Sequence, residues 1–128
     1  MVTDSTEYIY VLGDGDKIRE IVEYHLFNHD LEALTKFSLS LTNAINSLKD
    51  LATSTMNARV IIAGGDDILL LVPLEKYRKE LVQRLQEVFY NATGVTISFG
   101  IGRTVETVYI NLRKAKTAKN NKIVEEAK

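Results

Sequence analysis

Short apolar runs rich in β-forming residues alternate along this chain with longer stretches in which apolar residues recur every three or four positions. The first pattern is typical of strands and the second of amphipathic helices. The predicted strands are residues 8–12, 59–63, 68–72 and 95–101. The predicted helices are residues 17–27, 31–51 after an N-cap at Asp30, 74–89, and 104 to about 119.

Two glycine-rich turns follow apolar runs directly. Gly13-Asp14-Gly15-Asp16 comes after the first predicted strand, and Gly64-Gly65-Asp66-Asp67 separates the second strand from the third. A connection as short as the second one joins antiparallel strands in a hairpin, and glycine and aspartate suit tight turns. Both turns therefore place carboxylates at strand ends, where side chains can converge on a site.

The order strand, two helices, hairpin, helix, strand, helix predicts an α+β fold with helices packed on one face of an antiparallel sheet. The chain has 128 residues, of which 45% are hydrophobic. This is the size at which one domain builds one core. We therefore expect residues 1–128 to form a single domain, with the apolar stripes of the helices in its core.

The composition narrows the classes of protein. Charged residues make up 26% and the formal net charge is −1, which is typical of a soluble globular domain and does not indicate a nucleic-acid binder. The segment 103–128 is basic, with seven Lys or Arg against three Glu, so it can meet phosphates or simply form a solvated helix face. There is no cysteine, and no apolar stretch approaches the roughly 20 residues that span a bilayer. A cytoplasmic protein without membrane insertion is expected.

The hairpin turn carries the strongest chemical signal. Asp66 and Asp67 put adjacent negative charges at its tip, which favours a bound cation, and Mg²⁺ (or Mn²⁺) suits a pair of carboxylates completed by water and phosphate. Gly64 and Gly65 permit the tight loop and the approach of a ligand. Because the first strand can lie beside this hairpin, Asp14 could share a metal with Asp66, as two-metal phosphoryl transfer requires. Taken alone, a Gly-Gly-Asp-Asp turn is most often only a polar hairpin loop.

Other kinds of functional site have little support in this sequence. It contains no Gly-x-x-x-x-Gly-Lys phosphate loop and no spacing of Ser, His and Asp that indicates a nucleophilic triad. His25 and His29 are four residues apart, but no acidic signature accompanies them, so surface positions are expected.

Four segments together resemble the minimal CRISPR polymerase (mCpol) family. This family is related to the palm domain in the large subunit of type III CRISPR complexes and, more remotely, to GGDEF diguanylate cyclases. The segments occur in the family's order and extend over nearly the whole chain. They are VLGDGDKI at 11–18, RVIIAGGDDILLLVP at 59–73, TISFGIG at 96–102 and LRKAKTAKN at 112–120.

The resemblance implies a palm or ferredoxin-like fold, similar to GGDEF cyclases, and a role for each matching residue. It implies Asp14, Asp66 and Asp67 as catalytic metal carboxylates, with the Gly15 carbonyl as a further metal ligand. Lys116 matches a lysine that contacts phosphate. Lys119 matches a second lysine, although relatives usually have a glycine and one more residue between the two. The nucleotide-binding residues implied are Gly15, Asp16, Gly64, Gly65, Lys116 and Lys119.

The base expected is adenine. GGDEF enzymes carry an asparagine that reads guanine eight residues after the first metal aspartate, whereas this chain has Val22 there. A site without that polar group discriminates poorly for guanine, and the CRISPR-type relatives mostly use ATP.

The resemblance therefore implies a Mg²⁺-dependent nucleotidyltransferase that condenses ATP into a cyclic dinucleotide or small cyclic oligonucleotide. It also implies a homodimer, antiviral signalling, and a separately encoded effector that senses the product. Three alternatives stay open: a palm-fold module that binds nucleotide without turnover, a template-dependent polymerase or primase, and an RNA-binding ferredoxin-type domain. A template enzyme would need a basic groove and further segments, and the RNA-binding type would need exposed strand aromatics, neither of which is evident. No stable nucleic-acid template is therefore expected.

Overall fold

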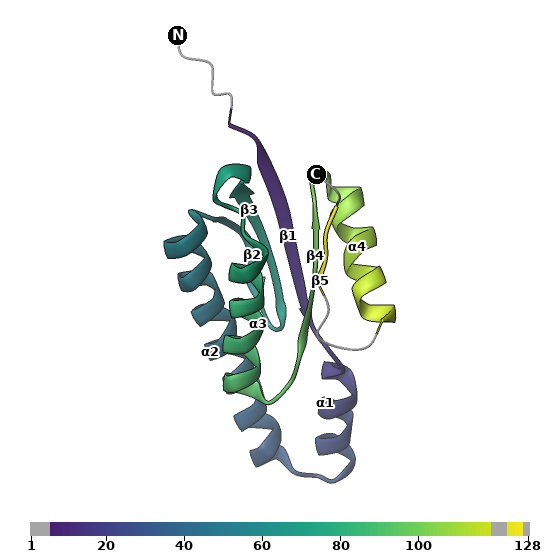
Figure 1. Ribbon diagram of the computed structural model, residues 1–128. Helices are drawn as coiled ribbons and strands as arrows, with labels where there is room; N and C mark the ends of the chain where they lie inside the picture. Colours follow the sequence, from purple (N-terminus) through teal and green to yellow (C-terminus); the bar gives the residue numbers. More distant parts are fainter. Residues whose placement is uncertain (1–5, 119–122, 127–128) are drawn as a thin grey trace.

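The computed structural model describes residues 6–118 and 123–126. Along this part of the chain, the predicted strands and helices occur in the predicted order (Figure 1). The strands are β1 (Tyr8–Gly15), β2 (Arg59–Gly64), β3 (Asp67–Pro73), β4 (Ile97–Gly102) and β5 (Ile123–Val124). The helices are α1 (Ile18–Phe27), α2 (Leu31–Met56), α3 (Lys79–Thr93) and α4 (Val105–Thr117), and a 3₁₀ turn, η1, spans Leu74–Lys76.

The strands of the described residues form one five-stranded sheet in the order β2-β3-β1-β4-β5. β1 lies at its centre and pairs antiparallel with β3 and β4. β2 and β3 form the predicted antiparallel hairpin. β5 was not predicted, and it runs parallel to β4 at the edge of the sheet. A strand of two residues is too short to leave a pattern in the sequence.

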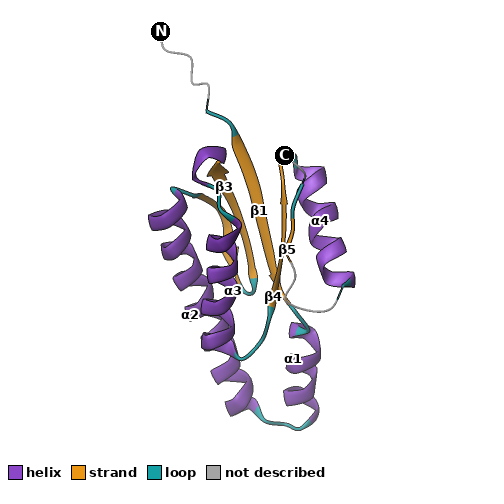
Figure 2. Ribbon diagram, viewed as in Figure 1, coloured by secondary structure: helices purple, strands orange, loops and turns teal. Residues whose placement is uncertain are grey.

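The predicted α+β class is confirmed, and α2 and α3 cover one face of the sheet as expected (Figure 2). Successive side chains of a strand point to opposite faces. Ile9 and Val11 of β1 therefore point to the same face, where they lie in a buried cluster with Leu48 of α2 and Phe89 of α3. The main hydrophobic core lies in this layer.

Helix α4 lies against the face of the sheet opposite α2 and α3. The expectation that all helices share one face is therefore not met by α4. Small residues of β4 make room for it: a Cβ atom added at Gly100 would meet the backbone of Val108 and Leu112. With α4 on one face and the main core on the other, every residue of β4 is buried. This close packing brings the C-terminal turn of α4 to the end of β1, where Asp14 and Asp16 lie.

Some element boundaries also differ from the sequence prediction. The Asp30 carboxylate accepts a hydrogen bond from the Ala33 backbone amide at 3.0 Å, which confirms the N-cap of α2. α2 continues past the predicted end to Met56, which is fully buried. α3 begins only at Lys79, because η1 and the extended backbone of Tyr77 precede it. The predicted end of the last helix near Lys119 lies outside the described residues.

Candidate metal and nucleotide site

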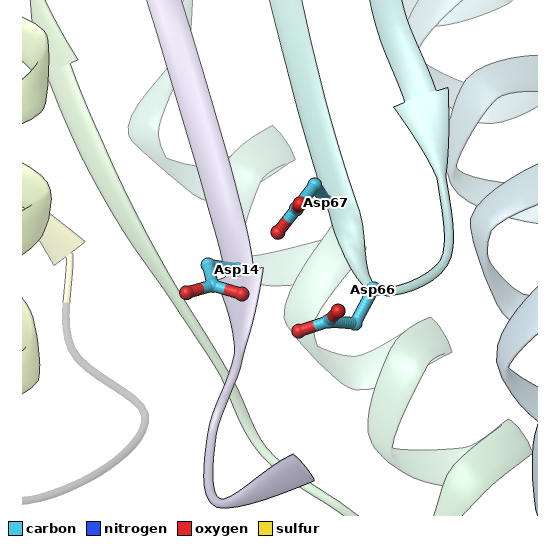
Figure 3. A group of neighbouring side chains, drawn as sticks. All are labelled: Asp14, Asp66 and Asp67. Carbon is cyan, nitrogen blue, oxygen red and sulfur yellow. The ribbon is translucent and has the colours of Figure 1, made fainter. Parts of the chain in front are cut away.

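The acidic residues of the two turns meet at one end of the sheet. In the pairing of β1 with β3, Asp14 lies opposite Asp67, and Asp66 precedes Asp67 at the hairpin tip. One carboxylate oxygen from each of the three residues lies within 4.8 Å of the others (Figure 3). The expectation that the first strand runs beside the hairpin is therefore met. We refer to Asp14, Asp66 and Asp67 as the acidic cluster.

Backbone contacts fix the hairpin tip against β1. The Gly15 amide donates hydrogen bonds to the Asp66 carbonyl at 3.2 Å and to Asp66 Oδ2 at 3.1 Å. A Cβ atom at Gly15 would lie 2.9 Å from Ile18 Cδ1 and 3.2 Å from Asp66 Cβ, so a larger residue would have to displace these side chains. Gly65 has a positive φ of 58°, and nothing lies within 4 Å of the position of a Cβ at Gly64 or Gly65. The tip is therefore open to a ligand.

Burial and the neighbouring carboxylates raise the pKa of Asp66 and Asp67. Desolvation raises the pKa of Asp66 to about 7, and its contacts with Asp14 and the charge of Asp67 add to the shift. Desolvation, followed by the contact with Asp14, raises the pKa of Asp67 to about 6. Carboxylates this close together are most stable when a cation lies between them. Their oxygens form the donor set that Mg²⁺ and Mn²⁺ prefer.

Asp16 is not a member of the acidic cluster and binds other partners. Its carboxylate is 4% exposed and accepts hydrogen bonds from Thr96 Oγ1 at 2.7 Å and from Ser98 Oγ at 2.9 Å. It also accepts one from Lys116 Nζ at 2.8 Å. Burial by itself would raise the pKa of Asp16, but the hydrogen bonds from Lys116, Thr96 and Ser98 outweigh burial and hold the pKa below its usual value. Asp16 is thus an ionised, buried partner of Lys116.

Lys116 links the last turn of α4 to the end of β1 and to Asp16, which follows β1. Besides Asp16, its ammonium group donates to the backbone carbonyls of Asp14 and Gly15, each at 2.8 Å. Asp14 Oδ2 lies 3.5 Å from the same nitrogen. The Gly15 carbonyl, which the resemblance implied as a metal ligand, here accepts from Lys116. Lys119, the second implied lysine, lies outside the described residues.

A pocket of 740 Å³ lies beside the acidic cluster and is lined by the start of α1 and by the C-terminal half of α4. This volume is in the range of ligand-binding pockets. Asp14 and Asp66 line one side of it. The cationic side chains in its lining are Lys17, Arg19, Arg113 and Lys116. Sequence reasoning gave Lys17 and Arg19 no role and treated Arg113 only as part of the basic C-terminal segment, because only the packing of α4 brings these residues to one pocket.

The histidines take no part in this site. Among the described residues, the acidic cluster is the group of potential metal ligands, and neither His25 nor His29 belongs to it. His29 is exposed, as expected, and the half-buried His25 packs its ring against Tyr24 and Phe37.

The raised pKa values predict that Mg²⁺ stabilises the fold in a pH-dependent way. In the folded chain the pKa values of Asp66 and Asp67 lie above the ordinary 3.8. Protonation of these two groups therefore stabilises the metal-free fold, and this contribution is complete below a pH equal to the ordinary pKa. This contribution is lost as the pH rises through about 6 to about 7. Mg²⁺ then replaces the lost protons. We expect Mg²⁺ to raise the thermal midpoint clearly at about pH 8 and hardly at about pH 5.

Differential scanning fluorimetry with Mg²⁺ or with EDTA at both pH values measures this effect. Asp66→Asn serves as the control, because it removes one of the titrating carboxylates and should reduce the Mg²⁺ response at the higher pH. An equal Mg²⁺ response at both pH values would contradict binding at the acidic cluster.

The sheet order, the hairpin beside the central strand and the acidic cluster define a palm-type domain related to polymerases and nucleotide cyclases. The chain belongs to the minimal CRISPR polymerase family: it matches the domain described as mCpol, minimal CRISPR polymerase, over residues 10–126. The resemblance found in the four sequence segments is therefore confirmed. No protein of curated function matches the chain.

Solved structures of Csm1 and of GGDEF-domain proteins are similar in fold to this chain. The palm region of Csm1, in the Csm1–Csm4 cassette in complex with pppApA, matches with a TM-score of 0.78 and 19% identity over 94% of this chain. This chain spans only 21% of that Csm1 chain. An EAL/GGDEF domain protein from M. capsulatus matches with a TM-score of 0.59 and 16% identity, covering 98% of this chain and 88% of its own. Diguanylate cyclase SiaD from Pseudomonas aeruginosa, in complex with its activator SiaC, matches with a TM-score of 0.55 and 18% identity, covering 94% of this chain and 50% of its own.

None of the helices in the described residues is both long enough and apolar enough to cross a membrane.

Proposed function

We propose that this chain is a Mg²⁺-dependent nucleotidyltransferase that condenses nucleoside triphosphates, with ATP preferred, into a cyclic dinucleotide or small cyclic oligonucleotide. The observation that carries the proposal is the acidic cluster at the mouth of a pocket with cationic side chains. Carboxylate oxygens and cationic groups in the lining of one pocket suit a triphosphate with its divalent ion.

In this proposal Asp14, Asp66 and Asp67 hold the metal. The bound ions would activate the attacking ribose hydroxyl and neutralise the charge that develops on the triphosphate and the pyrophosphate leaving group. The hydroxyl oxygen forms a bond to the α-phosphorus, the bond from that phosphorus to the pyrophosphate breaks, and the hydroxyl proton passes to solvent. The open backbone at Gly64 and Gly65 lets the nucleotide approach the cluster, and Gly15 holds the hairpin tip at the end of β1.

Adenine is the proposed base. The Csm1–Csm4 cassette has been solved with AMPPNP, pppApA and cA3, all of which are adenine nucleotides. At 19% to 20% identity, these structures support only the fold of this chain. We infer adenine from their ligands together with Val22, whose side chain cannot form a hydrogen bond with guanine.

A product assay tests this function. Purified chain is incubated with each nucleoside triphosphate in turn, with Mg²⁺ or Mn²⁺, and the products are analysed by mass spectrometry and by sensitivity to nucleases of known linkage preference. A cyclic adenine product supports the proposal and reports the ring size and the 2′ or 3′ linkage. Nucleotide binding without any product would instead support a binding module, and extension of an added primer along a template would support a polymerase.

We also propose that the active form is a homodimer. The described residues contain one acidic cluster, whereas a cyclic dinucleotide requires two nucleotides, each with its ribose hydroxyl facing the α-phosphate of the other. A two-fold axis between two identical sites makes both attacks equivalent. A separately encoded effector in the cytoplasm would then sense the product as part of antiviral signalling.

Mixing experiments test the dimer. We expect excess Asp66→Ala chains to inhibit the wild type, because mixed dimers would sequester active subunits. Asp50→Ala chains, which lose an exposed charge on α2, should not inhibit. Activity strictly proportional to the wild-type concentration, together with a monomer in sedimentation during turnover, would contradict the dimer.

A further inference from the structure

The ammonium group of Lys116 has no hydrogen-bonding capacity left for a phosphate. It carries three donor hydrogens, and its nitrogen lies 2.8 Å from each of three acceptors: the Asp14 carbonyl, the Gly15 carbonyl and Asp16 Oδ1. A contact with a phosphate oxygen would require Lys116 to give up one of these bonds. Its side chain is only 25% exposed. The contacts thus assign Lys116 to holding the turn between β1 and α1.

Arg113 lies one turn earlier on α4 and lines the same pocket as Asp14 and Asp66. Its side chain is exposed, and it forms no hydrogen bond or ion pair with any of the residues that the structure describes. Its guanidinium carbon lies 6.0 Å from the ring centroid of Tyr109, which also lines the pocket. An arginine next to an aromatic ring keeps all five N–H donors available while the ring limits its motion.

A guanidinium group suits this position better than an ammonium group. It can offer two parallel N–H donors to one phosphate, and it is more weakly hydrated than an ammonium. Binding a nucleoside triphosphate beside the acidic cluster also adds negative charge to a region that already holds three carboxylates. With Lys116 committed to its three acceptors, the unengaged charge of Arg113 on α4 can offset part of that addition.

We propose that Arg113 is the residue of α4 that binds the β- and γ-phosphates of the nucleotide, and that Lys116 is a positioning residue for Asp14 and Gly15. This inference rests on the proposed function, since it concerns the ligand of the same pocket. It assigns the phosphate contact to a residue that neither the sequence motifs nor the charge of the C-terminal segment distinguished from its neighbours. Tyr109 supports the contact by restricting the orientation of the guanidinium.

Calorimetric titration with AMPPNP and with AMP, both in Mg²⁺, tests the proposal without requiring turnover. We expect Arg113→Ala to weaken AMPPNP binding about tenfold or more, as for other hydrogen bonds to charged groups. AMP lacks the β- and γ-phosphates, so its affinity should change by less than about twofold. Arg113→Lys, which keeps the charge and loses the paired donors, should give an intermediate loss of AMPPNP affinity.

Lys114→Ala is the matched control. Lys114 is the next residue on α4, is exposed, and does not line the pocket. Because Lys114 and Arg113 each carry one positive charge, the two alanine variants have the same change in net charge. Its AMPPNP affinity should stay that of the wild type. Equal AMPPNP affinity in Arg113→Ala and wild type would overturn the inference, as would an equal loss for AMP and AMPPNP or the same loss in Lys114→Ala.

The outcomes also separate this inference from the proposed function. Binding of AMPPNP that depends on Arg113, in a chain that forms no product, would contradict the nucleotidyltransferase and leave the phosphate contact in place. Product formation with unchanged AMPPNP affinity in Arg113→Ala would contradict the phosphate contact alone. A wild-type chain that binds no AMPPNP would overturn both.

Discussion

Replacing Asp66 by asparagine is expected to abolish product formation while leaving the fold intact. The change removes one of the three charges that would hold the metal, and a bound metal contributes several kcal/mol to the transition state. At about 1.4 kcal/mol for each factor of ten, turnover should fall by roughly a thousandfold or more. Asparagine keeps a side-chain oxygen that can accept the hydrogen bond from the Gly15 amide.

The stability of the Asp66→Asn variant makes this prediction more specific. Burial and the neighbouring carboxylates raise the pKa of Asp66 to about 7, so its ionised form is unfavourable in the metal-free protein above that pH. In EDTA at about pH 8, the variant should therefore melt at or above the temperature of the wild type. This difference should disappear as the pH falls to about 4, where Asp66 is protonated in the wild type.

Initial rates of product formation and thermal melts in EDTA measure the two effects. Asp50→Asn is the control, because Asp50 is exposed on α2 and the variant loses the same charge. Near-normal turnover in Asp66→Asn would contradict the assignment of the metal to the acidic cluster. A lost activity that coincides with a strongly lowered melting temperature would instead indicate a structural role for Asp66.

The parts of the fold that depend on local patterns could be predicted from the sequence. The Asp30 cap, the hairpin around Gly64-Gly65 and the amphipathic stripe of α2 are each encoded within a few neighbouring residues, and each is present in the structure. The prediction that Asp14 and Asp66 lie close together is also met. It depended only on antiparallel pairing of β1 with the hairpin, which brings the strand ends together.

The features that depend on packing between distant segments could not be predicted. α4 packs closely on the face opposite α2 and α3, which the lack of a side chain at Gly100 permits. In the sequence, that glycine was only one residue of the TISFGIG segment at 96–102. η1 before α3 was missed because Leu74 and Tyr77 fit a helical spacing although the backbone of Tyr77 is extended. β5 depends on pairing with β4 rather than on its own two residues.

The same distinction applies to the site. The carboxylates of the acidic cluster lie on strand ends and could be recognised from their turns. The contacts of Lys116 could not, because they join residues about 100 positions apart in the chain. Arg113 had no distinguishing signal among the basic residues of the last helix. The position of α4 decides which of these residues face the pocket, and that position is set by packing.

Replacing Lys116 by methionine is expected to destabilise the fold as well as to lower turnover. Asp16 is 4% exposed, and Lys116 is the cationic partner of its buried carboxylate. Removing one member of a buried ion pair typically costs about 3 kcal/mol, which for a domain of this size lowers the melting temperature by roughly 10 °C. The two carbonyls at Asp14 and Gly15 lose their donor at the same time, so turnover should fall more than KM rises.

The pH dependence identifies the cause of this destabilisation. The pKa of Asp16 is held below the ordinary 3.8, so its pairing stabilises the wild type above that pH and this contribution is lost as the pH falls through the lowered pKa. The gap in unfolding free energy between wild type and Lys116→Met should therefore narrow in acid. Urea unfolding at several pH values measures the gap, and Lys114→Met, at an exposed site on the same helix, should show almost none. A normal melting temperature combined with a raised KM and unchanged kcat would contradict the positioning role and make Lys116 a direct phosphate ligand.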